Sequence, residues 1–116
     1  MNPNTRACIA FVAGKVIGSS GGSHVYDYAQ SRHLNVGGNV SQQNVNLYDY
    51  ERSCHFTGKL PQLYDHGTGF HVTLEIVGRV FKGYAYDSGT HFSGQVNGSS
   101  ISIYDFGAGQ HFNYSL

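Results

Sequence analysis

The sequence predicts an all-β fold, an antiparallel meander of about 10–11 strands built from internal hairpin repeats. Three observations support it. The pair Tyr-Asp occurs five times in 116 residues and contains every aspartate of the chain. A histidine follows each pair at a short and nearly constant distance. No stretch combines apolar residues at helical spacing with caps at both ends. Because a repeat of this kind fixes the architecture, it is interpreted before any single site.

We expect each Tyr-Asp pair to end one strand and the following histidine to begin the next. In four units the tyrosine and histidine are seven residues apart, which leaves a four-residue loop. The remaining unit is shorter, and Ser88-Gly89 should close it as a two-residue hairpin. The expected partners are Tyr26 with His33, Tyr48 with His55, Tyr64 with His71, Tyr86 with His91, and Tyr104 with His111.

At the opposite end of the sheet, each histidine is paired with the next tyrosine along the chain. This register places Glu75 opposite Lys82, a favourable cross-strand pair. The expected turns are Asn97-Gly98, Gly78-Arg79, Lys59-Leu60 and Val40-Ser41, the last of which a bulge would move to Gly38-Asn39.

The two faces of the sheet test this register. The residues next to the Tyr/His row are all apolar: Val12, Val25, Leu34, Leu47, Phe56, Leu63, Val72, Ala85, Phe92, Ile103 and Phe112. The following row is mostly polar. A slip of one residue would move the apolar set to the other face, so the pattern supports the register.

The first strand is expected at Cys8 to Ala13, with Phe11 facing Tyr26 and a turn at Gly18-Ser19. Because this segment is apolar on both faces, it should be covered on both sides. An eleven-stranded sheet would be roughly 50 Å wide and must cover its own apolar face. We expect it to curl into a flattened barrel or a two-layer sandwich, or to pair with a second copy. In a barrel of eleven strands, the first and last would have to pair in parallel.

Composition limits the classes of partner. The chain is expected to form a single repeat-built domain, residues 1–116. Only 12% of its residues are charged, and basic and acidic residues balance at seven each. We therefore expect no nucleic-acid partner. The apolar run near the N-terminus is too short for a signal peptide or a membrane span. Two cysteines that do not follow the repeat favour reduced thiols and a cytoplasmic location.

The chemistry-bearing residues do not predict an enzyme, a metal site or a cofactor. Successive histidines of the row would lie two strands apart, too far to share a zinc ion. No carboxylate differs from its siblings as a catalytic acid must. Each aspartate stands before turn residues, and its carboxylate can accept hydrogen bonds from their backbone N–H groups. The aspartates expected to cap turns are Asp27, Asp49, Asp65, Asp87 and Asp105.

The Tyr/His row is the candidate ligand-binding surface, made of the ten residues paired above. It would present flat rings with hydroxyl and imidazole edges, suited to a carbohydrate or another polar ligand. The alternatives are that the row only stabilises the sheet, or that the protein is a self-associating scaffold. Low charge favours a homo-oligomer. A lumen holding an apolar ligand is a third hypothesis. Because histidine titrates near neutral pH, acidification would make the row positive.

Two resemblances accompany this interpretation. The stretch from Tyr84 to Gly89 resembles the YD repeats of large bacterial shell-forming proteins, which also build β-hairpins. The likeness covers a few residues per unit, and His-Phe replaces the Arg-Leu that follows the loop in that family. It implies hairpins and nothing about a ligand. The glycine-rich, neutral surface is similar in general character to small microbial lectins, without a residue-by-residue match.

Overall fold

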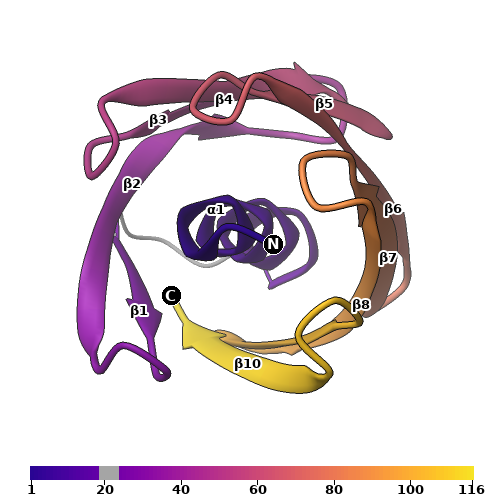
Figure 1. Cartoon of the computed structure of the whole chain (residues 1–116). Helices are drawn as coiled ribbons and strands as arrows, with labels where there is room; N and C mark the ends of the chain where they lie inside the picture. Colours follow the sequence, from indigo (N-terminus) through magenta and orange to yellow (C-terminus); the bar gives the residue numbers. More distant parts are fainter. Residues whose placement is uncertain (19–23) are drawn as a thin grey trace.

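In the computed structural model, which describes residues 1–18 and 24–116, ten antiparallel strands form a closed barrel around one helix (Figure 1). The strands follow one another around the wall in sequence order. They are β1 (His24–Asp27), β2 (Arg32–Val40), β3 (Val45–Asp49), β4 (Cys54–Lys59), β5 (Gln62–Asp65), β6 (Phe70–Val77), β7 (Val80–Ala85), β8 (Thr90–Asn97), β9 (Ser100–Asp105) and β10 (Gln110–Ser115).

The predicted antiparallel meander is confirmed, and it closes as a barrel rather than a sandwich. With ten strands instead of eleven, β1 and β10 run in opposite directions and pair, with Tyr26 opposite Ser115. The parallel closure that eleven strands would need does not arise. The molecule measures 29 × 28 × 27 Å, so the barrel is not flattened.

The predicted first strand is wrong, because Cys8 to Ala13 belongs to helix α1 (Pro3–Ala13). The side chain of Asn2 caps the helix by accepting two backbone N–H groups of its first turn, and Pro3 opens the helix where no donor is needed. A π-helical segment, η1 (Gly14–Gly18), continues it. The second residue of the predicted turn at Gly18-Ser19 lies outside the described residues.

Helix α1 runs through the lumen and fills it (Figure 1). Every residue from Thr5 to Ala13 is buried. A helix that is apolar on all sides belongs in a core, since no face of it can be left in water. The predicted apolar row is buried as well, with Val12 on the helix and the other ten residues on the inside of the wall. No helix in the described part of the chain is long and apolar enough to cross a membrane.

Three pairs of neighbouring hairpins are staggered, and this corrects three of the predicted pairings. Tyr48 lies opposite Gly37 rather than His33, a displacement of four residues. Tyr64 lies opposite Thr57, and Tyr104 opposite Ser93, each displaced by two. Strands in a closed barrel must tilt and stagger, which a row running straight across the sheet does not allow. All displacements are even, so each residue keeps its predicted face.

The turns move with the stagger. The turn Gly78-Arg79 and the pair Glu75–Lys82 are confirmed. The other turns connecting hairpins are displaced: Leu60-Pro61 replaces Lys59-Leu60, Gly98-Ser99 replaces Asn97-Gly98, and residues 41–44 replace Val40-Ser41 and its bulged form Gly38-Asn39.

Glycines in the wall make room for aromatic core residues. Phe81 lies opposite Gly94, and Phe92 lies opposite Gly83. A Cβ at Gly94 would approach Cζ of Phe81 to 2.4 Å, and a Cβ at Gly83 would approach Cζ of Phe92 to 2.5 Å. The two rings therefore cover the glycines across the strand pair, a device that supports glycine in a curved sheet.

We expect Phe11→Ala to lower the free energy of unfolding by about 3–5 kcal/mol, because the ring is 1% exposed and its loss would leave a cavity. Val77→Ala is the matched control: the side chain is 71% exposed, and its loss should change stability by about 0.5 kcal/mol or less. Urea denaturation measures both. Equal effects of the two substitutions would contradict a lumen filled by α1.

Candidate ligand-binding surface

Each of the five Tyr-containing hairpins carries three aromatic rings on its outer side, which we call a ring cluster. A central tyrosine lies near the end of the first strand, a histidine lies opposite it on the second strand, and a third ring follows the tyrosine by two residues. The five ring clusters are Tyr28/Tyr26/His33, Tyr50/Tyr48/His55, His66/Tyr64/His71, Tyr86/Tyr84/His91 and Phe106/Tyr104/His111.

The clusters repeat one geometry closely. Each central tyrosine ring lies 4.7 to 4.9 Å from both of its neighbours, centroid to centroid, and the ring planes meet at 65 to 80°. Such edge-to-face pairs contribute about 0.5–1.5 kcal/mol beyond the area they bury. The central tyrosines are half-buried, whereas the histidines and third rings are exposed. The rings are therefore held in place before any ligand arrives.

The prediction that Tyr86 pairs with His91 is wrong, because Tyr84 lies opposite His91. The fourth hairpin thus has the same four-residue loop as the others, residues 86–89, instead of the two-residue loop Ser88-Gly89. Gly89 ends it at φ 67°, in the left-handed region that Gly69 and Gly109 occupy in the equivalent loops. Tyr86 becomes the third ring of this cluster.

In four clusters the third ring (Tyr28, Tyr50, His66 or Phe106) was not among the predicted site residues, and in the fourth hairpin Tyr86 was predicted only as the partner of His91. The signal of the third ring is nonetheless in the sequence, since an aromatic residue stands two positions after each central tyrosine. The third ring is the first residue of the loop, directly after the last strand residue, so the alternation of the strand places it on the same side as the central tyrosine. The backbone N–H of this residue also ties its hairpin to the preceding one: those of His66, Tyr86 and Phe106 donate to carbonyl oxygens of His55, His71 and His91 at 3.0 to 3.2 Å.

The predicted continuous row is broken by the stagger, but two clusters do join. The rings of His55 and His66 meet edge to face with centroids 6.3 Å apart. This contact links the clusters of β3–β4 and β5–β6 into an array of six rings. The Nε2 of His66 also lies 3.2 Å from the hydroxyl of Thr57, which fixes the imidazole on the surface.

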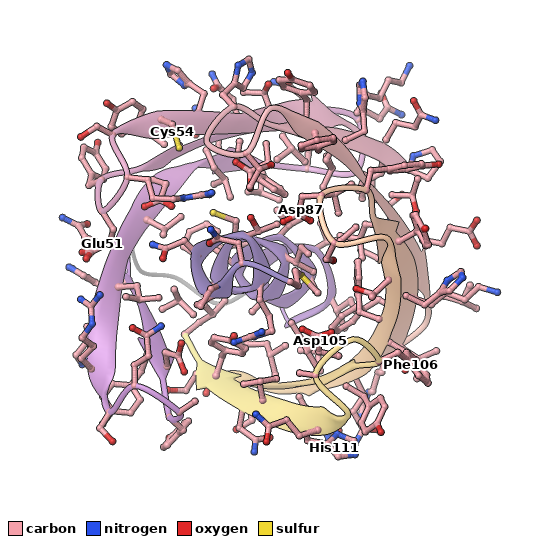
Figure 2. The ribbon with its side chains drawn as sticks, viewed as in Figure 1. Glu51, Cys54, Asp87, Asp105, Phe106 and His111 are labelled. Carbon is pink, nitrogen blue, oxygen red and sulfur yellow. The ribbon has the colours of Figure 1, made fainter. Side chains whose placement is uncertain are left out.

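The strand-end aspartates point the other way, into the barrel. Asp27, Asp49, Asp65 and Asp105 are fully buried. In each, Oδ1 accepts the backbone N–H groups two and three residues further along the loop, at 2.8 to 3.3 Å. In Figure 2, Asp105 lies inside the wall, whereas Phe106 and His111 lie outside it. These aspartates therefore shape the loops beneath the ring clusters.

The other carboxylate oxygen of three aspartates binds cationic or hydroxyl groups. Arg6 of α1 donates from Nη1 to Asp105 Oδ2 at 3.1 Å, and its guanidinium lies 3.4 Å from the ring centroid of Phe112. Arg52, from the β3–β4 loop, joins Asp49 and Asp65 at 2.6 and 3.1 Å.

Thr5 of α1 donates its hydroxyl to Asp65 Oδ2 as well. The first turns of the helix are thereby tied to the mouth of the barrel on two sides. Burial alone would lower the pKa of Arg52, but hydrogen bonds and charge from Asp49 and Asp65 raise it. The guanidinium therefore stays charged, and a charged partner faces both carboxylates.

Asp87 departs from the other four aspartates. It lies in the β7–β8 loop near the barrel mouth (Figure 2), and its buried Oδ1 has no hydrogen-bond partner. The expectation that Asp87 caps its turn is wrong, since Ala85 takes the strand-end position in this hairpin.

The two cysteine thiols are not activated. Burial raises the pKa of the Cys8 thiol, which is enclosed in the lumen, and also that of Cys54. Both thiols are therefore protonated at neutral pH and are poor nucleophiles. Within residues 1–18 and 24–116, no group of three or more His, Cys, Asp or Glu side chains could hold a metal ion.

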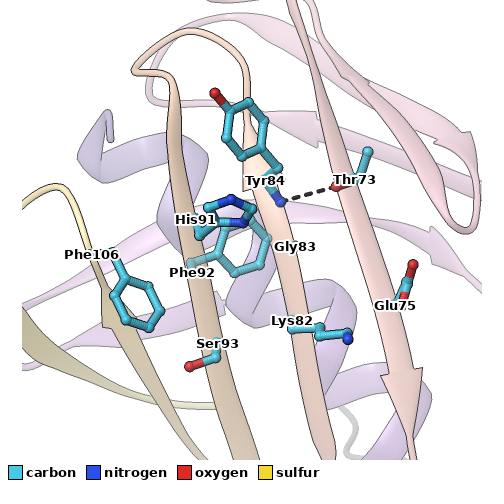
Figure 3. A pocket seen from close by; sticks show the side chains of 9 residues that line it. All are labelled: Thr73, Glu75, Lys82, Gly83, Tyr84, His91, Phe92, Ser93 and Phe106. Carbon is cyan, nitrogen blue, oxygen red and sulfur yellow. Dashed lines mark hydrogen bonds between the residues drawn. The ribbon is translucent and has the colours of Figure 1, made fainter.

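Shallow grooves lie beside several ring clusters on the outer surface. One, shown in Figure 3, runs between Tyr84 with His91 on one side and Phe106 on the other. A second lies beside Tyr48 and Tyr50, over Gly37 and Gly38. Short or polar side chains of the intervening strands form their floors. The outer surface thus offers recesses walled by aromatic rings, while the lumen is occupied.

Comparison with protein-family models, with curated proteins and with solved structures finds no match to this chain.

We expect Asp65→Asn to destabilise the fold by about 1.5–3 kcal/mol, because it removes the buried charge that binds Arg52 and the Thr5 hydroxyl, although Asp49 still pairs with Arg52. Asp27→Asn is the matched control. Asp27 caps its loop in the same way, but its Oδ2 accepts from the uncharged Gln30 amide, so a loss of about 1 kcal/mol is expected. Chemical denaturation at pH 7 compares them. If Asp27→Asn lowers the free energy of unfolding as much as Asp65→Asn does, the ion pair between Arg52 and Asp65 does not stabilise the fold as described.

Proposed function

We propose that the protein is a non-catalytic binding module, lectin-like in style, that binds carbohydrate on the outer surface of the barrel. The observation that carries the proposal is the fivefold repetition of one exposed ring cluster. Aromatic rings that only stabilise the fold are expected to be buried. Here Tyr28, Tyr50 and Phe106 are each 58% exposed, although the packing beneath them is ordered.

The chemistry of the surface suits a sugar. A pyranose ring has an apolar face of C–H groups, which packs on an aromatic ring, and hydroxyl groups around its edge. Tyrosine and histidine offer both an apolar face and a polar edge. Asn, Gln, Ser and Thr side chains stand on the outer face between the clusters, including Asn46, Thr57 and Ser93. A binding site with few charges also fits a neutral ligand.

The filled interior also favours the outer surface of the barrel as the binding site. The hypothesis of an apolar ligand in the lumen is wrong, because α1 occupies that space and is buried throughout. The strand-end aspartates are engaged with loop N–H groups and arginines, so the outer surface has no carboxylate pair drawn from the repeat. We also keep the cytoplasm as the proposed location, since Cys8 and Cys54 are free thiols.

Self-association as a scaffold is the second candidate. Val77 and Val80 flank the β6–β7 turn and are 71% and 52% exposed, which gives that hairpin tip an apolar surface. The net charge of zero would not oppose contact between copies.

We expect saturable binding on a glycan array, and a loss of at least tenfold in affinity for Tyr84→Ala and for Tyr104→Ala. These residues are the central rings of the clusters beside the groove in Figure 3. Phe70→Ala is the matched control, because Phe70 is 49% exposed but belongs to no ring cluster. Titration calorimetry measures affinity, and circular dichroism checks that each variant is folded.

Two outcomes would contradict the proposal. If Phe70→Ala reduces glycan affinity as much as Tyr84→Ala does, then any exposed ring binds the sugar and the ring clusters have no special role. Absence of glycan binding together with concentration-dependent sedimentation would favour the scaffold, and Val77→Lys should then restore a single small species.

A further inference from the structure

The groove in Figure 3 lies on a line of outward-facing residues that follows the curved wall of the barrel. Cross-strand partners connect one to the next from β6 to β10: Glu75, Lys82, Ser93, Tyr104 and His111. The recess shown in the figure and a second recess towards His111 both contain Glu75, Lys82 and Ser93, so they form one channel. Five strands at about 4.8 Å spacing give it a length of roughly 19 Å.

The cross-section of the channel is set by side-chain size. Ser93 and Ser102, both half-buried, leave its floor low between larger neighbours. Tyr84, His91 and Phe106 all stand on one side of this line, the side of the loops that follow β7 and β9 (Figure 3). A ligand in the channel would therefore lie across the strands, with rings beside it along part of its length.

The two charged groups of the channel are available to a ligand. Glu75 and Lys82 face each other across β6 and β7, both exposed, yet no ion pair of the described residues includes either of them. Hydrogen bonds from hydroxyl groups to a carboxylate, or from an ammonium to a hydroxyl, are about twice as strong as neutral ones. One end of the channel is thus polar and the other is aromatic.

We propose that this channel binds an internal segment of a linear oligosaccharide, which crosses β6 to β10 with about one sugar unit per strand. The inference rests on the proposed carbohydrate-binding function and names the class of glycan. A pyranose unit along a chain is about as long as the spacing between strands, so successive units meet successive residues of the line. Hydroxyl groups reach Glu75 and Lys82, one unit lies over Ser93, and another packs against Tyr104 and Phe106.

The test uses cellopentaose, N-acetylchitopentaose and maltopentaose, each beside its monosaccharide, with the full chain. We expect at least one pentasaccharide to bind at least tenfold more tightly than its monosaccharide. In NMR spectra its binding should shift the backbone amide signals of Lys82, Ser93 and Tyr104 in the unmodified protein. Ser93→Phe, which raises the floor, should reduce affinity at least tenfold. Gln62→Phe, an outward position on β5 outside the channel, should leave it unchanged.

The outcomes separate this inference from the proposed function. Two results would contradict the channel but not the proposed function. In the first, the glycan binds with the same affinity whatever its chain length. In the second, it shifts amide signals outside the channel and its affinity is unchanged by Ser93→Phe. If Ser93→Phe does not fold, the amide shifts of the unmodified protein are sufficient to test whether the glycan lies in the channel. Failure of every glycan to bind, on the array and in solution, would overturn both.

Discussion

The rest of the structure depends on the filling of the barrel lumen by α1. A closed ten-stranded wall encloses more space than its own side chains fill, and an empty apolar lumen would forfeit most of the packing that stabilises a core. The helix supplies apolar residues on all sides. Arg6 and Thr5 tie its first turns to strand-end aspartates at one mouth, where the positive end of the helix dipole also favours carboxylates. Interior packing and loop shape are thereby coupled.

That coupling leaves the outer surface for binding. Each strand-end aspartate turns inward and fixes its loop, and the tyrosine before it turns outward because successive strand residues point to opposite faces. The same dipeptide therefore encodes a buried anchor and an exposed ring. Closure of the barrel staggers the hairpins, so their rings form separate clusters with grooves between them. The fourth hairpin, with Ala85 in place of aspartate, keeps its ring cluster and lacks only the anchor.

The sequence predicted the strands, their antiparallel order and the buried face, because period-two alternation survives any even displacement of register. It did not predict the displacements themselves, since stagger is a property of the closed barrel and not of one hairpin. The shift at Tyr84 was missed because Tyr86, not Tyr84, precedes an aspartate. The helix was missed because a short apolar run fits a buried strand as well as a buried helix. The cap at Asn2 and Pro3 was the available signal. Of the site, all five histidines and four of the five central tyrosines were found; Tyr84 was missed, and of the third rings only Tyr86 was named.

Amide hydrogen exchange across α1 tests the filled lumen most directly. If the helix is enclosed by the barrel, the amides of residues 7–13 open only when the whole protein unfolds, and their exchange free energies should equal those of the most protected strand amides. NMR in deuterated buffer measures both sets in one experiment. Exchange of the helix amides within minutes, while the strands remain protected, would show that α1 leaves the lumen in the folded state and would contradict a binding surface confined to the outside.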